Sequence, residues 1–291
     1  MDYALTHRRC LTETCSTAPL LQVHSRKLVE SFDELVSERV LPIDMIWKVV
    51  ILAQGALWRH RSTRHPTRNL THGNKLANAI AIESHIATHI LDLHRVLLKI
   101  GTVQMGEGSQ EDGAKQDPAQ SITAVFRREL PALRLAGKWL RANIKYVLER
   151  SRTDAGGCME ANGSTGASGG GDRRTDKRQE SRRRSNIPNV TISGTHDFWR
   201  AFTEFSTTAL RMFPVARLPA LSVLLDEDRE TTGFLPLKRT TSTEAGFTMA
   251  GSASPNGDQA THPNIEFLMR IHELLLDAQA LAEEEVSNTP P

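Results

Sequence analysis

Hydrophobic residues along this chain recur every three or four positions in several separate segments, and they almost nowhere alternate with polar residues. The first spacing places apolar side chains on one face of an α-helix, whereas strict alternation is typical of a β-strand. The pattern therefore predicts an all-α protein. Because each predicted helix is apolar on one side only, we expect stacked antiparallel helical hairpins joined by long disordered loops.

Four helices are predicted in the first half of the chain. Their expected ranges are residues 25–40, 43–60, 75–100 and 132–149. Pro42 and Asp44 mark the start of the second helix, Gly101 the end of the third and Pro131 the start of the fourth. The side chains expected to be buried are Leu28, Phe32, Leu35 and Val36; Ile46, Val50, Ala53 and Leu57; Leu76, Ile80, Ile82, Ile86, Ile90, Leu93 and Leu97; and Leu133, Leu140, Ile144 and Leu148.

The second half of the chain predicts two helices separated by an apolar peptide. The helices are expected near residues 195–213 and 263–285, and their buried faces are expected to contain Phe198, Phe202, Phe205, Leu210 and Phe213, and Ile265, Leu268, Ile271, Leu275 and Leu276. Between them, an acidic turn at residues 226–230 leads into Gly-Phe-Leu-Pro-Leu-Lys-Arg. An exposed peptide of this composition is costly unless it docks in a groove. We expect Phe234, Leu235 and Leu237 to tie the two hairpins together.

Composition divides the chain into a helical domain in two parts and segments that cannot pack. The central linker is rich in Gly, Ser and Arg, which is typical of disorder. The expected boundaries are a disordered N-terminus at 1–24, helical parts at 25–150 and 195–285, a disordered linker at 151–194 and a tail at 286–291. Loops are expected at about 102–120 and 240–261.

The formal net charge of +2 conceals a split along the chain. Residues 121–150 contain seven Arg or Lys against two Glu, whereas residues 222–291 contain four Arg or Lys against twelve Asp or Glu. Such asymmetry indicates either a part that binds polyanions or two parts that attract each other.

Two basic clusters are candidate nucleic-acid contacts. Arg134, Lys138, Arg141 and Lys145 follow one another at spacings of four, three and four, which places them on one helix face. That face could bind an RNA backbone or the acidic C-terminal third of the same chain. The second cluster consists of Arg59, Arg61, Arg64 and Arg68 beside Trp58. It could bind phosphates and stack a base, or it could be a solvated helix end favoured by the helix dipole.

Residues 198–239 resemble the helical-hairpin domain of the ever-shorter-telomeres-one/SMG family, which includes the telomerase regulatory subunit and adaptors of nonsense-mediated mRNA decay. The resemblance rests on an acidic patch, Asp226, Glu227 and Asp228, shortly before Gly233-Phe234-Leu235-Pro236-Leu237. Residues 130–148 and 265–284 are similar to helices that flank this segment in the family. The resemblance implies a structural docking segment that comprises Trp199, Phe213, Gly233, Phe234, Leu235, Pro236 and Leu237.

The resemblance also implies a function. It predicts a non-catalytic scaffold that binds RNA or single-stranded DNA, and protein partners of mRNA decay or telomerase, in the nucleus or cytoplasm. About one hundred residues precede the hairpin match, so the family's N-terminal phosphopeptide-binding domain is not expected here. The alternative is a helical protein–protein adaptor that does not bind nucleic acid. In that case the cationic helix face would pair with carboxylates.

Nothing in the sequence indicates an enzyme, a cofactor or a small-molecule substrate. His85 and His89 have metal-ligand spacing, but Ile86 stands where the hydrolase pattern needs Glu, so no metal is expected. The most apolar window, residues 45–58, contains Lys48 and Gln54 and is too short to span a bilayer. A basic tract at residues 173–184 resembles a nuclear-import signal.

Overall fold

The computed structural model describes residues 17–63, 73–108, 118–151, 192–237 and 262–287. These residues are helical or lie in short connections, and none of them forms a strand, which confirms the all-α fold. The long helices are α1 Thr17–Ser37, α2 Ile43–Thr63, α3 Gly73–Gly108, α4 Ala124–Ser151, α6 Thr195–Met212 and α8 Pro263–Ser287. The short elements are η2 Pro118–Ser121, η4 Val215–Arg217, α7 Asp226–Glu230 and η5 Leu235–Leu237.

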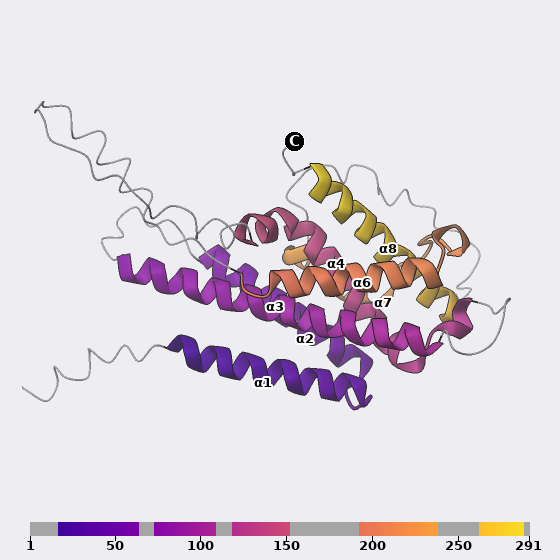
Figure 1. The fold of residues 1–291 in the computed structure, drawn as a ribbon, viewed down its shortest axis with the longest axis horizontal. Coiled ribbons are helices and arrows are strands. Elements are labelled where there is room, and N and C mark those ends of the chain that lie inside the picture. Colours follow the sequence, from indigo (N-terminus) through magenta and orange to yellow (C-terminus); the bar gives the residue numbers. More distant parts are fainter. Residues whose placement is uncertain (1–16, 64–72, 109–117, 152–191, 238–261, 288–291) are drawn as a thin grey trace, which may run out of the picture.

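Helix α3 is the centre of the assembly (Figure 1). It packs against α1, α2, α4 and α6, while α8 covers α4 and contacts α6. The buried side chains of these helices form one continuous hydrophobic cluster. The one-sided apolar faces are therefore buried against one another, as the periodicity predicts. No helix in the described ranges is long and apolar enough to cross a bilayer.

The prediction that Gly101 ends the third helix is wrong, because α3 continues to Gly108. Gly101 lies where three helices meet. A Cβ atom placed on it would lie 2.8 Å from the Phe205 ring of α6 and 3.2 Å from the Glu129 carboxylate of α4. The glycine is therefore needed for close packing and not as a helix stop.

The predicted start of the fourth helix after Pro131 is also wrong. Helix α4 begins at Ala124, and the Thr123 hydroxyl accepts a hydrogen bond from the Phe126 N–H at 3.2 Å. Pro131 therefore lies inside the helix, where it costs roughly 3 kcal/mol because it removes one backbone hydrogen bond. Phe126 and Leu130 are almost completely buried in the core, and their burial offsets this cost.

Helix α1 begins earlier than predicted, so disorder is the wrong expectation for residues 17–24. Several side chains that were expected to be buried are exposed: Leu28, Ile82, Leu210, Ile265 and Leu276. The predicted bounds of the helices near 195–213 and from 263 agree closely with α6 and α8. The remaining N-terminal residues, the linker at 152–191, the loop at 240–261 and the end of the tail lie outside the described residues.

Candidate nucleic-acid interface

The cationic face predicted on α4 is not free in the folded protein. Arg134 is completely buried, and its Nη1 atom lies 3.2 Å from Glu227 Oε1 and 2.7 Å from Asp228 Oδ2. Lys138 donates to Asp228 at 2.5 Å, and Arg141 donates to Asp277 at 2.9 Å. The prediction that this face is open to phosphates is therefore corrected for these three cations. Their positive charge is neutralised by the acidic C-terminal third.

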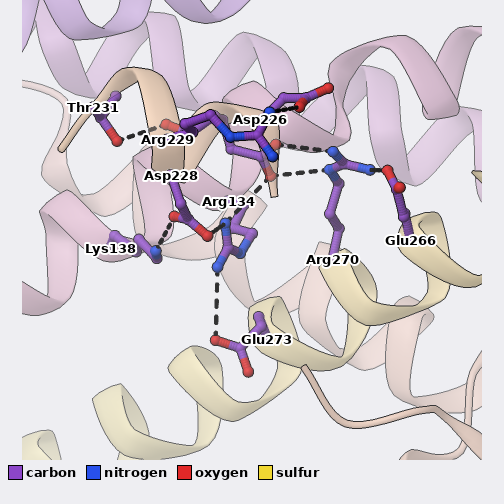
Figure 2. A network of polar contacts seen from close by, with 10 residues as sticks. Arg134, Lys138, Asp226, Asp228, Arg229, Thr231, Glu266, Arg270 and Glu273 are labelled. Carbon is purple, nitrogen blue, oxygen red and sulfur yellow. Dashed lines mark hydrogen bonds and ion pairs between the residues drawn. The ribbon is translucent and has the colours of Figure 1, made fainter. Parts of the chain in front are cut away.

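Glu227 is the centre of this ion-pair cluster, because it accepts hydrogen bonds from both Arg134 and Arg270. Figure 2 draws the network, with Arg134, Lys138, Asp228 and Arg270 labelled. The two carboxylate oxygens of Glu227 accept hydrogen bonds from Arg270 Nε and Nη2, both at 2.9 Å, while Arg134 approaches from the other side. Glu227 belongs to α7, Arg134 to α4 and Arg270 to α8. The cluster therefore connects three helices that lie far apart in the sequence.

The cluster keeps the Asp228 carboxylate ionised. Burial by itself raises the pKa of Asp228, but the positive charges of Arg134 and Lys138 outweigh it and hold that pKa below the usual value. Arg270 shows the same balance, because its contacts with Glu227 raise the pKa of its guanidinium despite burial. The charges therefore belong to the folded core and are not a binding surface.

The docking segment follows this cluster directly. Gly233 adopts a φ of +85°, which favours glycine, and turns the chain so that the Phe234 N–H donates to the Thr231 carbonyl at 2.9 Å. Pro236 is buried, and its carbonyl accepts a hydrogen bond from Asn143 Nδ2 of α4 at 3.4 Å. The segment therefore packs between α2 and α4.

The side chains that hold the segment differ in part from the prediction. Leu235 is 46% exposed, so it does not anchor the peptide, whereas Phe234 and Leu237 are half-buried. Phe213 is fully buried, and Trp199 packs edge-on against Phe198 with ring centres 5.1 Å apart. These two aromatic residues belong to the core around α6.

A groove of about 760 Å³ lies between α2 and α4 and continues from the docked segment. Its floor contains buried Leu57 and Trp139, and Leu235 and Pro236 lie along one part of it. The walls combine aromatic and charged side chains from the C-terminal halves of the two helices, namely Trp58, Arg61, Arg141, Lys145, Tyr146, Glu149 and Arg150.

Arg61 is held against the groove wall by two neighbours. Its guanidinium lies 4.3 Å from the centre of the Tyr146 ring, and its Nε atom lies 4.0 Å from the buried Glu83 carboxylate. The Tyr146 hydroxyl donates to Glu83 at 2.9 Å. Burial, together with the Glu83 charge, raises the pKa of Tyr146, so this hydroxyl stays protonated. Arg61 is thus oriented before any ligand arrives.

The structure regroups the predicted basic residues. Arg61, predicted as part of one cluster, and Lys145, predicted as part of another, line the same groove beside Trp58. Arg59, between Trp58 and Arg61 in the sequence, is exposed but does not line the groove, and Arg64 and Arg68 lie outside the described residues. Tyr146, Arg150 and Glu83 were not among the contacts predicted from the sequence. Tyr146 directly follows Lys145, but Glu83, which accepts its hydrogen bond, is 63 positions away in the sequence.

Of the two histidines with metal-ligand spacing, His89 contacts helix α1. His89 Nδ1 lies 2.7 Å from the Ser25 hydroxyl of α1, and burial lowers the pKa of this ring. Within the described ranges, no three His, Cys, Asp or Glu side chains come together as metal ligands.

No protein-family model, curated protein or solved structure matches this chain. The groove and the ion-pair cluster are therefore the features from which a function can be inferred. The family resemblance described above stays a prediction.

Proposed function

We propose that this protein is a non-catalytic helical scaffold that holds single-stranded RNA or DNA in the groove between α2 and α4. The observation that carries the proposal is that an exposed aromatic ring and cations from two facing helices share this groove. Trp58 is 42% exposed, and Arg61 and Lys145 stand on the facing helices. Proteins that bind single strands combine stacking on aromatic rings with cations that follow the backbone.

The charge around the groove supports a short contact with nucleic acid. Glu83, Glu149 and Glu284 also line the groove, so its lining is only weakly cationic. Arg59 adds a further exposed cation, and the sequence that follows α2 contains Arg64 and Arg68. Phosphates that bind these cations release counterions, which makes the affinity depend on salt concentration.

The cellular role follows from the resemblance to the ever-shorter-telomeres-one/SMG family. The role that this resemblance implies, and that we propose, is in nonsense-mediated mRNA decay or telomere maintenance, with protein partners of mRNA decay or telomerase, in the nucleus or cytoplasm. The groove would hold the nucleic acid while the rest of the helical surface contacts those partners.

One observation favours a second candidate, a helical adaptor for proteins alone. Arg134, Lys138 and Arg141 pair with carboxylates of the same chain. This is the arrangement expected of an adaptor that does not use its cationic helix face for phosphates. In the adaptor, the groove with Trp58 and the exposed Leu235 would accept a partner peptide.

Salt-dependent binding separates the two candidates. Fluorescein-labelled single-stranded RNA and DNA oligonucleotides are titrated with the full chain at two ionic strengths, and binding is followed by fluorescence anisotropy. A Trp58→Ala variant should weaken binding about 5- to 150-fold, which corresponds to about 1–3 kcal/mol of lost stacking. Arg61→Ala and Lys145→Ala should each reduce the slope of log K against log salt by about 0.7.

Exposed cations outside the groove provide the matched controls. Lys99→Ala on α3 and Arg211→Ala on α6 remove one positive charge each from exposed positions. They should leave the slope almost unchanged. Absence of binding would favour the adaptor. If the groove and control variants lose affinity and salt dependence equally, the interaction is non-specific electrostatic attraction.

A further inference from the structure

Helix α1 presents an apolar seam formed by Leu21, Leu28 and Leu35, of which the first two are exposed and the third is half-buried. The helix lies at the edge of the molecule and buries Val29, Phe32 and Val36 (Figure 1). Beside this buried face, Leu21 is 45% exposed and Leu28 is 62% exposed. Leu21, Leu28 and Leu35 are each seven residues apart, which keeps them on one line along the helix. This is the spacing of one of the two apolar positions of a heptad seam.

The charges on α1 are separated along the helix. Arg26 and Lys27 are exposed near its middle, and Glu30, Asp33 and Glu34 are exposed towards its C-terminal end. Lys27 and Glu34 are also seven residues apart, so they lie on the same flank of the seam. A second α1 in parallel orientation would place like charges side by side. An antiparallel one would place Lys27 next to Glu34 of the partner subunit, and the symmetry would repeat this pair.

We infer that α1 is a self-association surface through which two copies of this chain pair in antiparallel orientation. The leucine seam supplies the apolar contact, and the two symmetric Lys27–Glu34 pairs select the orientation. The exposed apolar residue Leu52 on α2 lacks this charge arrangement, because its neighbours Asp44 and Lys48 already pair with each other at 2.8 Å. The charge pattern therefore identifies α1, and a second copy, as the matching surfaces.

The dimer formed in this way is weak. A single helix seam is small compared with interfaces of standard size, so the dissociation constant should be roughly micromolar or weaker. Because exposed ion pairs are screened by salt, high ionic strength should shift the equilibrium towards the monomer.

Sedimentation velocity of the full chain over a wide concentration range tests the inference. The wild type should move from monomer to dimer as concentration rises, and Leu28→Asp should weaken this association at least tenfold. Leu52→Asp is the matched control, because Leu52 is 72% exposed and lies outside the seam. Circular dichroism checks that both variants keep their helices.

A charge exchange tests the orientation. Lys27→Glu alone and Glu34→Lys alone should each weaken the dimer, and the double variant Lys27→Glu/Glu34→Lys should restore it, because the pairs re-form with opposite signs. A wild type that stays monomeric, or a dimer that resists Leu28→Asp, would overturn the inference. A double variant that fails to recover would overturn the antiparallel pairing.

Discussion

Buried ionisable side chains are the most unusual residues of this core. His94 lies between Gln54, 3.3 Å away, and the edge of the Trp139 ring, and burial lowers its pKa to about 3. Glu129 is completely buried near Gly101, and neither carboxylate oxygen has a hydrogen-bond partner within the described structure. Burial raises the pKa of Glu129 well above its usual value. His94 is therefore neutral at physiological pH, and burial favours the protonated, neutral form of Glu129.

Glu129 makes a pH-dependent contribution that can be measured. Its pKa is higher in the folded state than in the unfolded state, so the wild type loses stability as pH rises above the unfolded pKa. Glu129→Gln removes the titratable group and keeps the shape of the side chain, so this dependence of stability on pH disappears. The variant should therefore be more stable than the wild type at pH 8, and its advantage should shrink as pH approaches 4. Urea melts at several pH values check this, and a pH-independent difference would contradict it.

The lowered pKa of His94 changes the stability of the protein with pH in the opposite direction. Because its folded pKa is lowered to about 3, its contribution to stability is present above the unfolded pKa and is lost as pH falls below about 6.5. Comparison of Glu129→Gln with the wild type at each pH cancels this effect, since both proteins contain His94.

At the scale of elements, α3 and α4 show how packing overrides local stop signals. Glycine and proline favour helix ends in isolated sequences, but the free energy of a helix in a protein comes mainly from its packed face. Gly101 in α3 and Pro131 in α4 are both surrounded by core residues. The helices continue through them because the neighbouring apolar side chains gain more from burial than the two residues cost.

Two glycines of α3 give a matched test of this view. A Cβ atom on Gly101 would lie 2.8 Å from Phe205, whereas one on Gly106 would meet no atom within 4 Å. Gly101→Ala should destabilise the protein by about 1–3 kcal/mol through overpacking. Gly106→Ala should stabilise it by about 0.5–1 kcal/mol through helix propensity. Chemical denaturation measures both, and equal effects would contradict the close packing at Gly101.

At the scale of the whole molecule, the cluster around Glu227 joins α4, α7 and α8 (Figure 2). A buried ion pair adds little net stability compared with well-packed apolar side chains, but removal of one partner leaves an uncompensated buried charge. The cluster therefore fixes how the C-terminal helices sit on α4. Asn143 of α4 holds the segment that follows α7 beside the groove through its hydrogen bond to the Pro236 carbonyl.

Glu227 and Asp226, two adjacent carboxylates in α7, allow a buried ion pair to be compared with an exposed one. Glu227→Gln leaves Arg134 and Arg270 without their shared partner, and it should cost about 3–5 kcal/mol. Asp226 pairs with Arg229 at the surface, with the two side chains 78% and 66% exposed, so Asp226→Asn should change stability by at most about 0.5 kcal/mol. Thermal and urea melts of the two variants provide the comparison. Similar losses would show that Glu227 does not hold the helices together.

How far the sequence predicts the candidate site depends on the range of the interactions involved. The bounds of α6 were predicted closely because periodicity is a property of neighbouring residues, and the start of α8 was marked by Pro263. The exposure of Leu28 and the burial of Arg134 were not predicted. Both depend on which other element covers that helix face. Arg61 and Lys145 were recognised as candidate contacts, but their common groove was not.

The sequence by itself determined that this protein is built from helices, and it located the acidic and basic segments. These segments attract each other in the folded protein. Helical periodicity and charge are local properties, so they can be read without coordinates. The tertiary structure alone decided which charged side chains form ion pairs in the core and which remain exposed to solvent. Arg134 and Glu227 are 93 positions apart in the sequence. Whether a cation meets water, a phosphate or a carboxylate depends on the segment that folds over it, and no local pattern specifies that segment.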